Sequence, residues 1–325
     1  LTTPILLMTQ EILMKILTKA GITQAQVDAA DDGQILNGCL ILLQNRYDEK
    51  AYFERKDVKY VIAKNLTVVS KLMFCRCQNL ELIYAPNVDR IEDGFTDEEN
   101  YGYGSFSETA LTDICFFKLL YGGINSFFAC QKAINVDLPL CNKVANYVFD
   151  SCSSIKVMSL PCVKTIGNWC FCQCSSMTDL IIPVAESVGK NCISSCKSLK
   201  SINCKLAANL FKCDWKDCKT CPVCTTEAEI CLQRGKDLLR DEVDQLQQQN
   251  TQLAQTVGQL KTQIDNQKKE TDQHKKEIEQ LKINLQNLTT QHNTKTKEIM
   301  LNRDETLKQM KDLIRETFKQ IESQV

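Results

Sequence analysis

The sequence predicts an α+β fold: a solenoid whose turns form a parallel sheet, capped by N-terminal helices and followed by a long α-helical coiled coil. Three patterns support this prediction. A repeat of 22 residues runs from Cys130 to Ser195, an amphipathic helical pattern precedes it, and a heptad pattern begins at Leu239. Because the patterns do not overlap, we expect three domains, at residues 1–32, 33–224 and 225–325.

The first 20 residues have the apolar spacing of an amphipathic helix. The pattern runs from Thr3 to Ala20, and Gly21 marks its end. A second short helix is expected from the Thr23 cap to about Asp31. Because a solenoid needs its exposed end covered, we expect these two helices to form the N-terminal cap. The apolar residues of the first helix are Ile5, Leu6, Ile12, Leu13, Ile16 and Leu17.

Three consecutive segments of 22 residues align without gaps. They read CQKAINVDLPLCNKVANYVFDS, CSSIKVMSLPCVKTIGNWCFCQ and CSSMTDLIIPVAESVGKNCISS. Each begins with a cysteine, carries apolar residues at the fourth, seventh and ninth positions and a proline at the tenth, and has a large apolar residue at the twentieth. Units of this kind can bury their apolar side only against neighbouring units, which is the principle of a solenoid.

The same frame extends in both directions and gives about eight turns. From Cys77 to Glu108 is 31 residues, nine more than one unit, so we expect an inserted loop around residues 96–104. The other units of the frame are expected to begin at Gly33, Arg55, Cys77, Glu108, Cys196 and Cys218.

The seventh to ninth positions of each unit are predicted to form a short strand. Because side chains alternate along a strand, the sixth and eighth positions point out onto the concave face. These residues are apolar and aromatic in the early units and include carboxylates later, so we expect the N-terminal half to contact a partner. The alternative is that a flanking segment covers it. The candidate partner-binding residues are Tyr60, Ile62, Leu82, Tyr84, Asp113, Asn135, Asp137 and Asp179.

One repeat pattern carries a family resemblance. Cys-x-x-apolar-x-x-Ile-x-Leu-Pro, followed by Ile-Gly and a Phe three residues before the next Cys, resembles the leucine-rich repeat of BspA-like proteins. The resemblance covers residues 33–222. Such repeats are known from bacterial and protist surface antigens and serve as binding surfaces for unrelated partners, so the resemblance implies a fold and leaves the ligand open.

The chain is cysteine-rich, and all 19 cysteines precede Leu232. A thiol that recurs at one position of a solenoid is a small buried apolar group. Together with the odd number of cysteines and the absence of a secretory leader, this predicts a reducing, cytoplasmic environment. The alternative is a cell-surface or secreted protein whose leader lies before Leu1, since Leu1 is not a methionine.

Four cysteines near the end of the repeats have the spacing C-x4-C-x2-C-x2-C. We expect free thiols that close the C-terminal end of the stack and no bound cofactor, because Cys218 is also in phase with the repeat. The alternative is zinc, which takes four thiolate or imidazole ligands in a tetrahedron and often uses C-x2-C pairs. The candidate zinc ligands are Cys213, Cys218, Cys221 and Cys224, or the last three with Cys231.

Several classes of function are disfavoured by composition. Both histidines, His274 and His292, lie after the repeats, so the repeat domain lacks the base of a Cys-His or Ser-His-Asp site. The sequence has no Walker-type loop and no dinucleotide fingerprint, and we expect a protein that is not an enzyme. A net charge of −1 disfavours nucleic acid as a partner. No run of 18 apolar residues predicts a transmembrane segment.

From Leu239 onward the apolar period is 3.5 residues. With Leu239 at position d, β-branched residues dominate position a and leucine dominates d, which favours a parallel two-stranded coil; Asn250 at a fixes the register. Glu270 and Glu277 at g can pair with Lys275 and Lys282 at e of the partner helix. The alternatives are a single long helix or an antiparallel fold-back. The predicted dimerisation residues are Val243, Leu246, Asn250, Leu253, Val257, Leu260, Ile264, Ile278 and Leu281.

These observations predict a non-enzymatic protein–protein interaction scaffold, with a repeat domain as the recognition surface on a parallel coiled-coil homodimer. Two recognition surfaces on one stalk would bind multivalently. Two alternatives remain open: a secreted or cell-surface adhesin or antigen, as the resemblance suggests, and a zinc-dependent adaptor built on the cysteines between Cys213 and Cys231.

Overall fold

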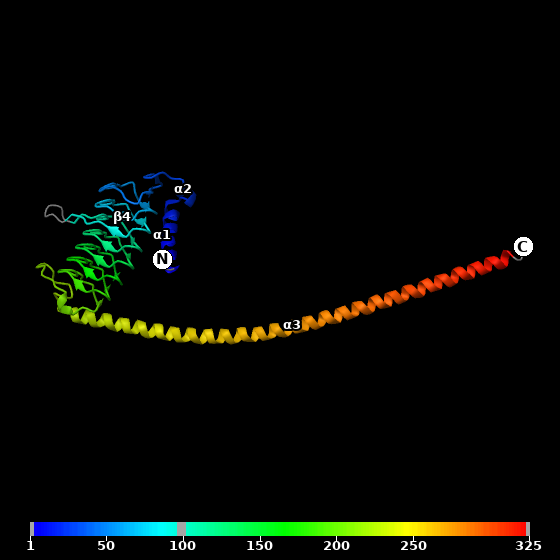
Figure 1. Cartoon of the computed structure of the whole chain (residues 1–325). Coiled ribbons are helices and arrows are strands. Elements are labelled where there is room, and N and C mark those ends of the chain that lie inside the picture. The colour runs from blue at the N-terminus through cyan, green and yellow to red at the C-terminus, as the bar shows by residue number, and fades with distance from the viewer. Residues whose placement is uncertain (1–2, 96–101, 323–325) are drawn as a thin grey trace. The chain divides into compact units, whose positions relative to one another are not determined.

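The computed structural model describes residues 3–95 and 102–322. The chain divides into two compact units, residues 1–244, here called the repeat unit, and residues 245–325, called the helical unit. Helices α1 (Thr3–Ala20) and α2 (Gln24–Asp28) precede the strands, and α3 (Ala228–Glu322) begins in the repeat unit and continues through the helical unit (Figure 1). Among the described residues, no helix is both long and apolar enough to cross a membrane.

Eight three-residue strands stack in parallel along one side of the repeat unit and are called the front sheet. Their register advances by one repeat at each step: Val157 pairs with Asp179, and Asp179 pairs with Ser201. Each strand lies one position earlier in the repeat than predicted, at the sixth to eighth residues. The strands are β2 (Cys39–Ile41), β3 (Tyr60–Ile62), β5 (Leu82–Tyr84), β7 (Asp113–Cys115), β9 (Asn135–Asp137), β11 (Val157–Ser159), β13 (Asp179–Ile181) and β15 (Ser201–Asn203).

Six two-residue strands form a second parallel sheet, the back sheet, one turn of chain after each front strand. They are β4 (Val68–Val69), β6 (Arg90–Ile91), β8 (Tyr121–Gly122), β10 (Lys143–Val144), β12 (Thr165–Ile166) and β14 (Ser187–Val188). Six turns therefore carry both strands, and β2 and β15 begin and end the stack. The predicted fold class is confirmed: a parallel-sheet solenoid with an N-terminal helix and a long C-terminal helix. The pairing of that helix in a coiled coil stays a prediction.

A short hairpin starts the front sheet. Strand β1 (Ile35–Leu36) pairs antiparallel with β2, and the turn between them is Asn37-Gly38. Both turn residues have positive φ, 49° for Asn37 and 80° for Gly38, which is the backbone that a tight two-residue hairpin requires.

The core between the two sheets contains a ladder of phenylalanine rings. The ring of Phe106 stacks 5.3 Å from Phe74 and 5.4 Å from Phe127, and that of Phe149 stacks 5.5 Å from Phe127 and 6.0 Å from Phe171. Each turn adds one ring at the same position of the repeat. The ladder therefore couples every turn to its two neighbours, as expected for a solenoid.

The recurring cysteines form a second column beside this ladder. The Sγ atoms of Cys152, Cys174 and Cys196 donate hydrogen bonds of 3.0–3.2 Å to the carbonyl oxygen of the phenylalanine in the preceding turn. Burial raises the pKa of these thiols, so they stay protonated and can donate. All nineteen cysteines are free thiols.

The frame around the insertion differs from the sequence prediction. Thr109, not Glu108, occupies the cysteine column, because its Oγ1 lies 3.3 Å from Cys130 Sγ. Phe106 rather than Phe95 supplies the ring of that turn. The sequence frame missed this because the segment after Thr109 is one residue shorter than in other turns. The inserted residues 96–101 lie outside the described residues; on either side of them, Phe95 N donates to Tyr103 O at 2.9 Å.

The first turns of α3 pack against the last turn of the solenoid. Cys231 and Leu232 are buried in the same core cluster as the phenylalanine ladder. Gly235 lies so close to β15 that an added Cβ would be 2.3 Å from the carbonyl oxygen of Ile202. A glycine is therefore required here for the close approach of the helix backbone.

Candidate functional site

Helix α1 lies across the front sheet and covers its first strands. Ile16, Leu17 and Ala20 on the helix form one buried cluster with Tyr60, Ile62 and Leu82 on β3 and β5. In this cluster Ile16 and Leu82 are fully buried, and Tyr60 and Ile62 are 7% and 1% exposed. The apolar stripe of the helix therefore has its partner within the chain.

The prediction that Tyr60, Ile62 and Leu82 are exposed is wrong. The reason is that α1 buries them, and Tyr84 packs partly buried against the same cluster. The alternative, that a flanking segment covers these strands, describes the structure. Likewise, α1 lies along the face of the front sheet, whereas the sequence predicted a cap at the end of the stack.

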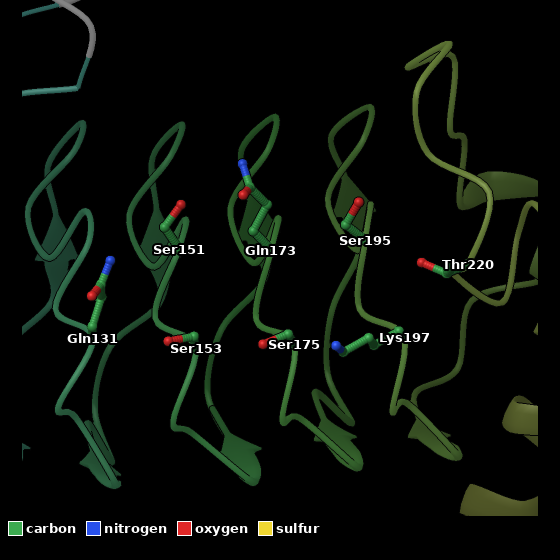
Figure 2. A pocket seen from close by; sticks show the side chains of 8 residues that line it. All are labelled: Gln131, Ser151, Ser153, Gln173, Ser175, Ser195, Lys197 and Thr220. Atoms are coloured by element: carbon green, nitrogen blue, oxygen red, sulfur yellow. The ribbon is translucent and has the colours of Figure 1, made fainter.

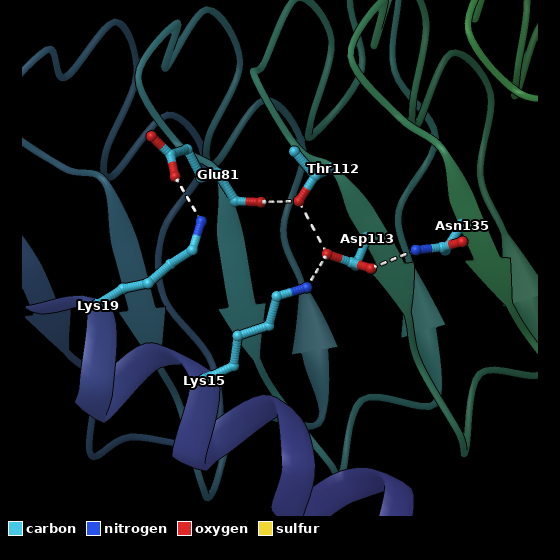
Figure 3. A network of polar contacts seen from close by, with 6 residues as sticks. All are labelled: Lys15, Lys19, Glu81, Thr112, Asp113 and Asn135. Atoms are coloured by element: carbon cyan, nitrogen blue, oxygen red, sulfur yellow. Dashed lines mark hydrogen bonds and ion pairs between the residues drawn. The ribbon is translucent and has the colours of Figure 1, made fainter.

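Two lysines of α1 bind carboxylates on the front side of the repeat unit (Figure 3). Lys15 Nζ lies 2.8 Å from Asp113 Oδ2, and Lys19 Nζ lies 3.2 Å from Glu81 Oε2. Asp113 also accepts hydrogen bonds from Thr112 and from Asn135 Nδ2. Burial raises the pKa of the Asp113 carboxyl, but the hydrogen bonds from Lys15 and Asn135 outweigh it and hold that pKa below its usual value.

The two lysines were missed as functional residues by sequence reasoning. The signal that could have found them is their spacing: Lys15 and Lys19 are four residues apart and flank the apolar stripe, so they share one side of the helix. Asp113 and Asn135 were predicted to face a partner, and the structure instead engages both in this internal network.

We expect an Ile16→Asp variant to release α1 from the front sheet. Burying an unpaired carboxylate costs several kcal/mol, so the helix should detach while the phenylalanine core stays folded. Hydrogen exchange of the amides in β3 and β5 should then accelerate by at least about tenfold, equivalent to roughly 1.4 kcal/mol of lost protection. Met14→Asp, on the 59% exposed side of the same helix, is the matched control. Equal exchange in both variants would contradict the packing role of Ile16.

Beyond α1, the front sheet is open to solvent. Val157 on β11 is 47% exposed and Asn135 on β9 is exposed, while Asp137, Asp179 and Ser159 are partly exposed. Burial raises the pKa of the Asp137 carboxyl. Of the predicted partner-binding residues, only Asn135, Asp137 and Asp179 belong to this open surface, which is called the open face and comprises the outward residues of β9, β11, β13 and β15.

The structure brings four cysteines together at the C-terminal end of the repeat unit. The Sγ atoms of Cys213, Cys218, Cys221 and Cys224 all lie within 4.8 Å of one another. Cys231 is not among them: its Sγ faces Leu199 O at 3.6 Å in the core. Burial raises the pKa of Cys218, but the backbone amides of Ser195 and Cys221 outweigh it and lower that pKa to about 6.

The comparison with protein-family models decides the class of the repeats. The model described as BspA type leucine rich repeat region matches in six copies over residues 99–218. Residues 99–218 are a BspA-type leucine-rich repeat region. Such regions are generally binding modules, and the curated proteins contain no match to this chain.

Two solved structures are similar to the chain containing this BspA-type region. One is a leucine-rich repeat protein of T. pallidum, with 18% identity, a TM-score of 0.31, and coverage of 51% of this chain and 64% of that one. The other is a leucine-rich repeat protein from Bacteroides ovatus ATCC 8483, with 16% identity, a TM-score of 0.38, and coverage of 56% and 53%. The chain therefore spans less than two thirds of either protein.

The BspA-type region also carries a shallow polar groove of about 390 Å³. Figure 2 shows its two rows: Gln131, Ser153, Ser175 and Lys197 at the second position of the repeats, and Ser151, Gln173 and Ser195 at the last. The residues of the second row have positive φ, between 57° and 63°. Hydroxyl and amide groups line this groove, and Lys197 is its single charged residue, so it can offer hydrogen bonds but no acid–base pair.

In the long helix, the predicted seam is exposed to solvent in the single chain. Its eight apolar members are between 41% and 66% exposed, and Asn250 is exposed as well. These residues share one stripe of α3 because they recur at a and d of the heptad. The members are Val243, Leu246, Asn250, Leu253, Val257, Leu260, Ile264, Ile278 and Leu281.

Proposed function

We propose that the protein is a non-enzymatic protein-interaction scaffold, in which the open face of the BspA-type region binds a partner. The observation that carries this proposal is the division of the front sheet. Its early strands are buried under α1, while β9 to β15 present a row of accessible side chains. A solenoid that covers part of its own sheet and leaves the rest open has a defined place for a partner to dock.

The chemistry of the open face favours a partner with apolar groups flanked by basic ones. Val157 and Ile181 offer apolar contact area, and Asp137 and Asp179 beside them offer carboxylates. Such a mixture suits lysine or arginine side chains, whose stems pack on apolar residues while their charged ends reach carboxylates. Cytoplasmic location belongs to the same proposal, since the column cysteines are placed as protonated thiols.

The second part of the proposal is that the helical unit joins two copies in parallel. An isolated helix leaves its apolar stripe in water, and a parallel partner would bury the seam and pair Glu270 with Lys275 and Glu277 with Lys282. Two open faces on one dimer would bind paired sites on a partner more tightly than either face alone.

A single substitution tests the open face. Val157→Asp should remove partner binding, because a carboxylate then occupies the apolar centre of the face. The control is Val184→Asp, the same change at a valine that is 37% exposed and lies outside the front strands. Quantitative affinity capture followed by mass spectrometry should find proteins bound by wild type and by Val184→Asp but lost with Val157→Asp. Identical capture by both variants would contradict the proposal.

A further inference from the structure

The four-cysteine cluster has the geometry of a closed metal site. Zinc bound by four thiolates has Zn–S distances of about 2.3 Å, which places the sulfurs roughly 3.8 Å apart in a tetrahedron. In the structure, the Sγ atoms of Cys213, Cys218, Cys221 and Cys224 lie within 4.8 Å of one another. A contraction of less than about 1 Å would therefore complete the tetrahedron.

Cys218 departs from the pattern of the cysteine column. In the preceding turns the thiol donates to a phenylalanine carbonyl, as Cys196 does to Phe171 O at 3.0 Å. Cys218 Sγ instead accepts a hydrogen bond from the backbone N–H of Ser195 at 3.1 Å. An N–H donor suits a thiolate, the form in which cysteine binds a metal. The repeat phase thus continues to Cys218, but its side chain takes a different role.

The residues around the cluster hold the other sulfur positions. Ser194 Oγ lies 2.9 Å from Cys213 Sγ and can donate to it. Asn191 fixes the loop after Cys213, since its Oδ1 accepts from Asp214 N at 2.8 Å and from Trp215 N at 3.2 Å. Partners of this kind orient metal ligands in proteins. The loop also contains Lys212, Lys216 and Lys219, whose charges oppose the net −2 of a zinc ion with four thiolates.

We propose that Cys213, Cys218, Cys221 and Cys224 bind one Zn²⁺ in a closed structural site. Soft thiolates in a tetrahedral set of four select zinc or iron, and we assign zinc, as in other structural sites with four cysteines. Cys221 is fully buried, Cys218 is 5% exposed, and α3 begins four residues after Cys224. The ion would therefore tie the last turn of the solenoid to the segment that enters α3, independently of any partner at the open face.

Metal analysis of the full-length protein, purified without added chelator, tests this proposal. Inductively coupled plasma mass spectrometry should find one zinc per chain, and exchange into Co²⁺ should give the ligand-field and thiolate charge-transfer absorption of a tetrahedral thiolate site. Cys224→Ser is the test variant because Cys224 is exposed, and Cys162→Ser, also exposed but outside the cluster, is the matched control. Loss of a direct ligand should weaken zinc binding by more than about 100-fold.

The outcomes separate cleanly. Stoichiometric zinc in wild type and in Cys162→Ser, with loss in Cys224→Ser, supports the site. A metal-free protein that gives no cobalt spectrum overturns it, and so does bound iron in place of zinc. Equal zinc content in the two variants, or disulfides within the cluster found by alkylation and mass spectrometry of freshly purified wild type, also overturns it. Far-ultraviolet circular dichroism of both variants shows that the fold is retained.

Discussion

Replacing Phe127 by alanine is expected to lower the free energy of unfolding of the repeat unit by about 3 to 5 kcal/mol, the usual cost of removing a buried phenylalanine ring. Phe127 is fully buried at the middle of the ladder. Its ring stacks 5.4 Å from Phe106 and 5.5 Å from Phe149, and lies 5.9 Å from Phe116. No side chain from the next turn can fill the space, because every turn already supplies its own ring.

The position of Phe127 makes a second effect expected. Each turn of a solenoid is stabilised only by its neighbours, so a defect in the middle weakens the coupling between the two halves. We expect denaturant unfolding of Phe127→Ala, followed by circular dichroism, to become broader or to separate into two transitions. The control is Phe128→Ala, which removes the same ring from the adjacent, partly exposed position. A loss of stability as large in the control would contradict the ladder as the source of the effect.

The solenoid was predictable because its period is a property of the sequence. A shift of 22 residues relates Val157 to Asp179 and Asp179 to Ser201, and the same pairs are adjacent in the front sheet. The fourth and twentieth positions are buried in each aligned turn, as for Ile155 and Phe171. The frame failed only where the period itself is broken, between Phe95 and Leu111, because insertion and shortening there displace Thr109 and Phe106.

The covering of the front sheet was not predictable in the same way. Period two determines which side chains point outward, but it does not determine what lies on them. Tyr60, Ile62 and Leu82 were correctly placed on the outward side and incorrectly taken as free. The pattern did contain a signal: outward residues are apolar under α1 and polar beyond it, as at Asp179. An apolar helix stripe next to an apolar part of a sheet indicates that the two pack together.

The cysteine cluster shows a different limit. Spacing allowed two ligand sets, because Cys221 belongs to both C-x2-C pairs and Cys231 is close in sequence. The choice depends on where the chain turns into α3, since Cys231 enters the core as part of that helix. Sequence spacing carries no information on that turn, whereas the coordinates place Cys213 with the other three.

The largest expected effect in the helical unit comes from lysines placed in its seam. The triple variant Leu246→Lys, Leu253→Lys, Leu260→Lys replaces three d-position leucines, each of which contributes about 1.5 to 3 kcal/mol when buried. In a parallel dimer both chains lose these contacts, and the new lysines face one another across the seam. We expect the dissociation constant to rise by more than about 1000-fold, which corresponds to roughly 4 kcal/mol.

Light scattering coupled to size exclusion measures this directly, because one chain has a mass of 36.9 kDa. Wild type should elute at twice that mass and the triple variant at the mass of one chain. Gln248→Lys, Gln255→Lys, Thr262→Lys adds the same charge at the f positions of the same heptads, away from the seam, and should remain a dimer. A wild type that is monomeric at micromolar concentration, or a control that also dissociates, would mean that the stripe from Val243 to Leu281 does not pair two copies. In that case only a single open face would be available to a partner, and the avidity expected from two faces would be lost.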